Sequence, residues 1–65
     1  MYYISVVNDV TGEEMEHLSL INEKDAGVLF KDAVFSLIES PGKFHVYLKD
    51  RVGDLCEYKR VGLDW

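Results

Sequence analysis

The chain of 65 residues is long enough for one small domain and too short for two. Its composition, 48% hydrophobic and 29% charged with five Gly and one Pro, is typical of a globular protein and excludes a disordered or collagen-like chain. The formal charge of −5 argues against nucleic-acid binding through phosphate neutralisation, which needs clustered Lys and Arg.

The sequence also predicts the cellular location of the protein. No apolar run approaches the roughly 20 residues of a membrane span, and Met1-Tyr2-Tyr3 does not begin like a secretory signal. The single cysteine, Cys56, rules out an internal disulfide and favours a reducing compartment, so we expect a cytoplasmic protein.

Residues 2–7 alternate in the way of a strand, and a hairpin follows them. A three-residue loop at 10–12, closed by Gly12 in the left-handed region, would place Asp9 opposite Glu13. The pairs that follow are Val7 with Met15, Val6 with Glu16, Ser5 with His17, Ile4 with Leu18, Tyr3 with Ser19 and Tyr2 with Leu20.

A helix is predicted next. Asn22 is a favourable cap, and the acids Glu23 and Asp25 suit the positive end of the helix dipole. Ser40-Pro41-Gly42 ends the helix. Apolar residues between these signals recur at alternating steps of three and one, which gives one apolar face: Ala26, Leu29, Phe30, Ala33, Val34, Leu37 and Ile38.

Residues 44–49 alternate again and predict a second hairpin with its loop at 51–53. In this register Leu48 faces Cys56, and Cys56 lies in the core as a small hydrophobic residue. A register that put Glu57 on the face of Val46 would bury a carboxylate, so we reject it. The predicted core face comprises Phe44, Val46, Leu48, Cys56 and Tyr58, with Phe44 opposite Arg60.

Together these elements predict a single α+β domain over residues 1–65. It is a two-layer ββαββ sandwich, with one helix packed on a four-stranded antiparallel sheet. The order of the central strands is left open. So is the place of Trp65, which either folds back on the core edge or docks on a partner.

Two surfaces remain after the core is assigned. The sheet face opposite the helix should be polar, yet it carries side chains typical of interfaces. We expect it to bind a partner or a second copy through Tyr3, Val7, Met15, His17, His45, Tyr47 and Leu55. The outward side of the helix is a second candidate for the same roles, through Val28, Lys31 and Phe35.

Motifs for catalysis or cofactors are lacking. A chain this short offers little concavity, and its five glycines form no phosphate-binding loop. His17 and His45, with Glu16 or Glu57, match no metal motif. We therefore expect a protein that is not an enzyme and that holds no cofactor or metal.

The net negative charge lies in the first 25 residues, which hold six acids and one base, Lys24. Such asymmetry marks a binding face for a basic partner or a solvated surface. In size, charge and architecture the chain resembles small phage accessory proteins such as anti-CRISPR and antirestriction inhibitors. The resemblance implies an acidic patch that mimics phosphates toward a nucleic-acid-processing protein, formed by Asp9, Glu13, Glu14 and Glu16.

Function is therefore expected to be protein binding, as an inhibitor or adaptor that is itself a homodimer. One alternative is a homo-oligomeric structural or assembly protein, because a 65-residue domain often needs oligomerisation for stability. A second alternative is a small RNA-binding sheet, in which Tyr3 and Tyr47 would stack on bases. Direct nucleic-acid binding is disfavoured, since the charge is acidic and we expect no basic rim around those rings.

Overall fold

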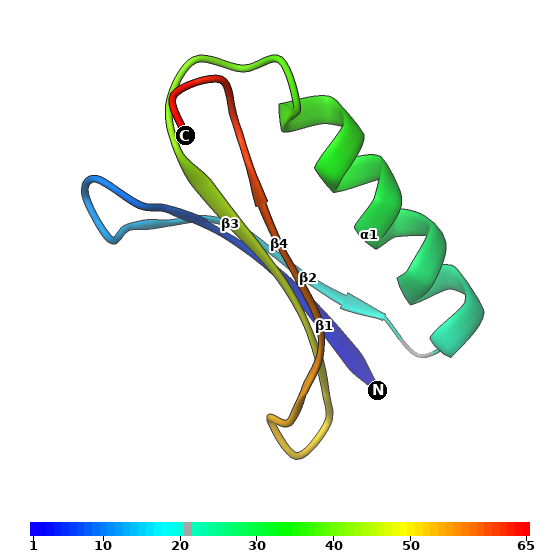
Figure 1. Ribbon diagram of the computed structural model, residues 1–65. Helices are drawn as coiled ribbons and strands as arrows, with labels where there is room; N and C mark the ends of the chain where they lie inside the picture. The colour runs from blue at the N-terminus through cyan, green and yellow to red at the C-terminus, as the bar shows by residue number, and fades with distance from the viewer. Residues whose placement is uncertain (21) are drawn as a thin grey trace.

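The computed structural model describes residues 1–20 and 22–65, with the backbone alone at residues 16, 17 and 20. It confirms the ββαββ sandwich, in which one helix covers one face of a four-stranded antiparallel sheet (Figure 1). The elements are β1 (Tyr2–Asn8), β2 (Glu14–Leu20), α1 (Glu23–Leu37), β3 (Phe44–Asp50) and β4 (Leu55–Val61). No helix of the described residues has the length and hydrophobicity needed to cross a membrane.

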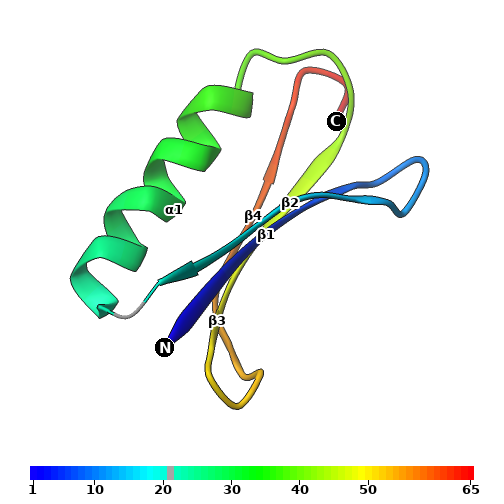
Figure 2. The same cartoon turned by 180° about the vertical axis from the view of Figure 1, so that it is seen from behind.

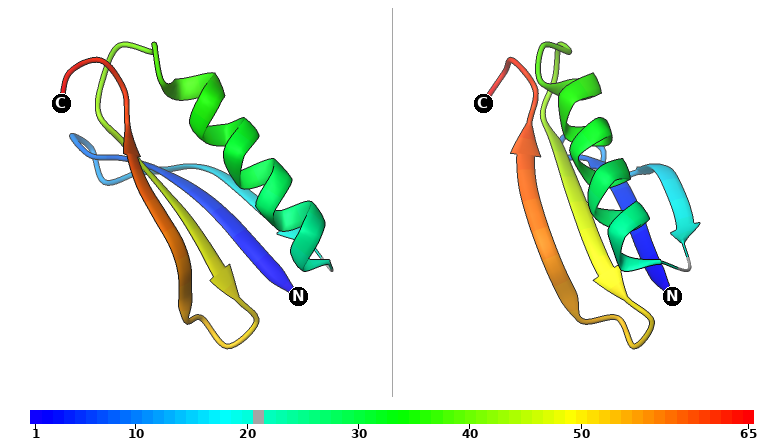
Figure 3. Two further views of the ribbon diagram at one scale, coloured as in Figure 1. Left: turned by 45° about the vertical axis from the view of Figure 1, so that its right-hand side comes forward. Right: turned by 90° about the vertical axis from the view of Figure 1, so that its right-hand side faces the viewer.

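The strand order, which the sequence left open, is β2-β1-β3-β4. The two central strands are therefore the first and third of the chain, and they pair antiparallel with Ile4 opposite Leu48 and Val6 opposite Val46. The helix lies over these central strands, and the edge strands β2 and β4 flank it on either side (Figure 3). In Figure 1 and Figure 2 the sheet is seen nearly edge-on, with the helix on one side and no second layer on the other.

The core lies between α1 and the central strands. Ile4 and Val46 are its largest fully buried side chains, and Ala26 and Phe30 meet them from the helix. At the start of α1 the Asn22 side chain accepts a hydrogen bond from the Lys24 amide at 2.8 Å, as its capping role predicts. The buried apolar set is Ile4, Val6, Ala26, Phe30, Phe44, Val46, Leu48 and Val61.

The first hairpin has a longer loop than predicted. Asn8, rather than Asp9, pairs with Glu13, because its amide donates to the Glu13 carbonyl at 2.9 Å and its side chain accepts from the amides of Val10 and Thr11. A bulge between Val6 and Val7 then places Val7 opposite Glu14, so the predicted pair of Val7 with Met15 is wrong. Beyond the bulge the pairs are the predicted ones: Val6 with Glu16, Ser5 with His17, Ile4 with Leu18, Tyr3 with Ser19 and Tyr2 with Leu20.

The second hairpin shows the reverse: its loop is as predicted and its register is not. The Gly53 amide donates to the Asp50 carbonyl at 3.0 Å, with Gly53 at a φ of +91°. A bulge between Leu48 and Lys49 then shifts the strand by one residue, so that Leu48 faces Glu57. The pairs that follow are Val46 with Lys59, Phe44 with Val61, Tyr47 with Tyr58 and His45 with Arg60.

The core positions predicted for Cys56 and Tyr58 are therefore wrong, and both side chains are exposed. The predicted register excludes Glu57 from the helix side because a carboxylate would be buried there, but Glu57 lies on that side and is exposed. The reason is that β4 is an edge strand, and α1 lies mainly over β3 and β1. A carboxylate on the helix side of β4 therefore stays in water at no desolvation cost.

The chain closes with a tight turn that returns Trp65 to the sheet. The amides of Leu63 and Asp64 donate to the carbonyls of Ser40 and Gly42, at 2.9 and 3.2 Å. The Trp65 indole N–H donates to the Val61 carbonyl at 2.8 Å. Trp65 therefore folds back on the sheet, but it lies against His45 and Arg60 on the open face and not on the core edge.

Candidate binding face

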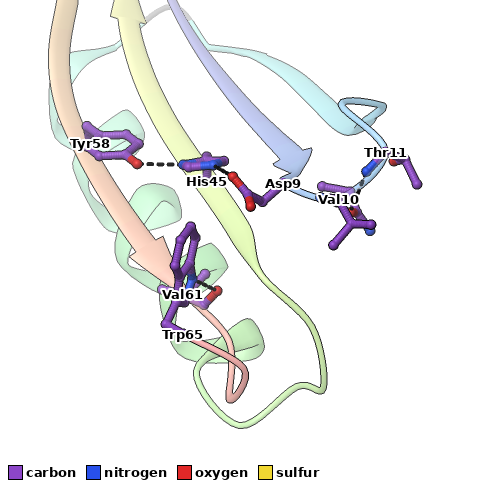
Figure 4. A network of polar contacts seen from close by, with 8 residues as sticks. Asp9, Val10, Thr11, His45, Tyr58, Val61 and Trp65 are labelled. Carbon is purple, nitrogen blue, oxygen red and sulfur yellow. Dashed lines mark hydrogen bonds and ion pairs between the residues drawn. The ribbon is translucent and has the colours of Figure 1, made fainter.

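The open face of the sheet gathers its aromatic side chains over β3 and β4. Because of the bulge, Tyr58 lies opposite Tyr47, and Arg60 lies opposite His45. Figure 4 shows the Tyr58 hydroxyl and the Asp9 carboxylate on either side of the His45 ring, with Trp65 close by. We call six residues of this face the open-face cluster: Asp9, His45, Tyr47, Tyr58, Arg60 and Trp65.

Two hydrogen bonds link three side chains of the cluster in series: Tyr58, His45 and Asp9. The His45 ring contacts the Tyr58 hydroxyl through Nδ1 and the Asp9 carboxylate through Nε2, both at 2.5 Å. An ionised carboxylate only accepts, so Nε2 carries a proton, and in a neutral ring Nδ1 accepts the Tyr58 proton. These bonds tie the β1–β2 loop to β3 and β4, and the Asp9 amide adds a bond to the Lys43 carbonyl at 2.9 Å.

The rings of the cluster pack against one another. The His45 ring is stacked on Tyr58 and meets Trp65 edge-on, with ring centres 5.7 and 5.3 Å apart. The rings of Tyr47 and Tyr58 lie 5.1 Å apart. These separations fall in the range in which aromatic pairs attract. Trp65 nevertheless stays 46% exposed, so it remains accessible to a partner.

Cations lie over two of these rings. The Arg60 guanidinium is 5.0 Å and the Lys43 ammonium 5.6 Å from the centre of the Trp65 ring, and the Lys49 ammonium is 5.4 Å from that of Tyr47. The expectation of no basic rim concerned Tyr3 and Tyr47, and it is wrong at Tyr47, which Lys49 covers. The cations over Trp65 were not foreseen, because the predicted register placed Arg60 on the core face.

The remaining residues predicted for this face lie around the cluster. Tyr3 is opposite Lys49, Val7 is opposite His45, and Leu55 is opposite Lys49 from the other side. Met15 lies at the bulge of β2 and is exposed. The backbone of His17 pairs with Ser5, and its side chain lies outside the described part.

The structure describes the side chains of three of the four predicted acids: Asp9, Glu13 and Glu14. Asp9 is bound to His45, and Glu13 lies in the exposed turn before β2. Glu14 is opposite Val7 on the open side, whereas the backbone of Glu16 pairs with Val6 and its side chain lies outside the described part.

The outward line of α1 is exposed as expected, with Phe35 at 77%. This side of the helix borders strand β4, and a groove of about 270 Å³ separates them. The groove is lined by Phe30, Lys31, Val34, Phe35, Glu57 and Lys59. Val28 lies about two turns before Phe35 on the same side of the helix and is also exposed.

The cluster presents aromatic rings, cations and hydrogen-bonding groups on an open sheet. Within residues 1–20 and 22–65, no group of three or more His, Cys, Asp or Glu side chains is placed to hold a metal. The hydrogen-bonded side chains of Asp9, His45 and Tyr58 follow the order acid, base and hydroxyl that is found in catalytic triads. It lies on an open sheet, and three depressions found on the described surface are lined by other residues. Stacking and hydrogen bonding with a partner are what this arrangement offers.

Sequence reasoning missed Tyr58, Arg60 and Trp65 as members of this face. One signal was present: charged residues at alternate positions of β4, Glu57 and Lys59, are typical of an edge strand that the helix does not cover.

Comparisons with known proteins identify no relative of this chain. No family model matches the chain, and no curated sequence or solved structure shows significant similarity to it.

Proposed function

We propose that this chain is a non-enzymatic protein-binding module, an inhibitor or adaptor of the cytoplasm, that docks through the open-face cluster. One observation carries the proposal: Trp65 folds back beside His45 and Arg60, in one cluster with Tyr58, on an uncovered sheet face. Trp, Tyr and Arg are the residue types most enriched in binding hot spots. Their rings and cation are already ordered by mutual contacts, which lowers the entropy cost of binding.

The cluster favours a partner of defined chemistry. Lys43 and Arg60 lie over the Trp65 ring and carry positive charge at its edge. A protein surface with a carboxylate beside an apolar or aromatic side chain would pair with those cations and pack on the exposed indole. The phosphate-mimic version has less support, because the Asp9 carboxylate is already bound to His45.

The test is a capture experiment from a bacterial lysate with three versions of the chain. The wild type and Val52→Ala, which alters an exposed apolar residue of the β3–β4 loop, should retain one stoichiometric protein. Trp65→Ala should bind that protein at least tenfold more weakly, as expected when a hot-spot residue is removed. A partner retained by Trp65→Ala, or the capture of no partner at all, would contradict docking through the cluster.

A second candidate partner is single-stranded nucleic acid, and the observation that favours it is the set of three cations beside the aromatic residues. Aromatic rings and adjacent basic side chains are the two parts of a single-strand platform, and Lys43, Lys49 and Arg60 provide the second part. Trp65 is the only tryptophan. A titration with a single-stranded oligonucleotide at low salt therefore reads out this site through indole fluorescence. Saturable quenching that disappears at high salt would favour this candidate, and unchanged fluorescence would exclude it.

A further inference from the structure

We propose that two copies of this chain pair through strand β4, antiparallel and with Tyr58 of one copy opposite Tyr58 of the other. The pairing joins two sheets edge to edge with both helices on one side. β4 is the outermost strand, and its residues 55–60 are all exposed. Every second residue of an edge strand directs its N–H and C=O groups away from the sheet, so β4 offers a template for another strand.

Charge sets the register of this pairing. Glu57 and Lys59 lie on the helix side of β4, opposite Leu48 and Val46. When Tyr58 lies on the twofold axis, Glu57 of each copy is directly opposite Lys59 of the other, which gives two attractive cross-strand pairs. An axis through Glu57 or Lys59 would instead place two like charges face to face.

The other edge strand lacks this self-complementarity. Strand β2 has the sequence EMEHLSL, which contains two acids and neither Lys nor Arg. Two copies of β2 would bring no opposite charges together, so the pairing of like edges favours β4. A mixed pairing of β4 with β2 of another copy would leave free edges at both ends and grow into a filament.

The groove beside β4 gives the exposed Phe35 a place in this dimer. The helix lies mainly over β3 and β1, so with strands about 4.8 Å apart the two helix axes would be roughly 19 Å apart across the twofold axis. Packed helices are about 8–10 Å apart, so a gap remains above the two β4 strands. Phe35, Val34 and the stem of Lys31 line the groove from each copy and would fill that gap.

The competing interpretation is that Lys59 protects a bare edge, since lysine on an edge strand commonly prevents pairing. Mass measurements on the full chain over a range of concentrations separate the two. The proposal expects a species of twice 7.5 kDa that dissociates on dilution. A mass of 7.5 kDa at every concentration, or a mass that keeps growing, would overturn it.

A charge swap tests the register. Glu57→Lys places like charges opposite each other twice and should raise the dimer dissociation constant about tenfold or more. Adding Lys59→Glu to that variant restores both pairs and should return the constant to within about threefold of the wild type. Glu39→Lys makes the same charge change after the end of α1 and should leave the constant unchanged. A double variant as weak as the single one would refute the register.

A cross-link offers a second measurement that does not depend on the charges. Residues opposite each other in an antiparallel pair have Cα atoms about 4.5–5.5 Å apart, which a disulfide spans. Tyr58→Cys in a Cys56→Ser background should therefore oxidise to a covalent dimer. Val52→Cys in the same background, on the exposed β3–β4 loop, should not. Equal cross-linking of both variants would contradict the pairing.

Discussion

At the scale of single residues, two glycines differ in whether the fold would accept a side chain in their place. Gly62 has a φ of +117°, which L side chains rarely adopt, and a Cβ there would overlap the carbonyl oxygen of Gly42. Gly27 lies within α1, and a Cβ there would meet nothing within 4 Å. The first glycine is required by the turn that returns Trp65, whereas the second only weakens the helix.

This contrast predicts opposite effects of one substitution. Gly62→Ala should lower the free energy of unfolding by about 2 kcal/mol or more, from backbone strain and overlap. Gly27→Ala should raise it by about 0.5–1 kcal/mol, because alanine favours a helix. Urea unfolding of both variants checks the pair, and a stabilised Gly62→Ala would show that the turn is not as tight as described.

At the scale of elements, the cap of α1 is the local interaction most open to measurement. Asn22→Ala removes the side-chain bond to the Lys24 amide and should cost about 1 kcal/mol of stability. Ser36→Ala is the control on the same helix, since Ser36 is exposed and its hydroxyl donates to the Ala33 carbonyl within the helix. It should be neutral or slightly stabilising. Equal losses from both variants in thermal unfolding would contradict the capping role.

Periodicity made the elements predictable. Alternating strands, the three-and-one spacing of the helix and the loop at 51–53 are local patterns, and each led to the right element. The register within β1–β2 was also right beyond the bulge. The loop is one residue longer than expected, which alone would shift the register. The bulge adds one residue to β2, Met15, and this restores the predicted pairs.

The candidate site was less predictable because it depends on a bulge. Cys56 is the extra residue in β4, and it moves Tyr58 and Arg60 to the open face and Glu57 to the helix side. Alternation alone cannot reveal such a shift. The rejection of Glu57 from that side assumed that the helix covers all four strands equally, and strand order, which a single sequence does not determine, decides that coverage.

At the scale of the whole molecule, the two proposed surfaces meet at strand β4. The open-face cluster lies on one side of the sheet, and the groove of Phe35 lies on the other, beside α1. Only β4 belongs to both, through Tyr58 and Arg60 on one side and Glu57 and Lys59 on the other. Dimerisation through β4 would therefore bring two open-face clusters side by side on one continuous surface.

Dimerisation also predicts how stability depends on concentration. If the folded state is a dimer, mass action raises the melting temperature as the chain becomes more concentrated. A tenfold increase adds about 1.4 kcal/mol per dimer, which for a domain of this size corresponds to a rise of about 4 °C. Glu57→Lys should flatten this dependence. A melting temperature of the wild type that is independent of concentration would contradict the dimer.

The pairing of β1 with β3 also has a kinetic consequence. The two hairpins and the helix are local structures, but the core forms only when residues 2–8 meet residues 44–50. An isolated two-stranded hairpin is at best marginally stable in water, and closing so long a loop carries an entropy cost before any core contact is made. During synthesis the first 40 residues would therefore remain unfolded until β3 has left the ribosome. The folding rate should then be limited by this closure rather than by helix or hairpin formation.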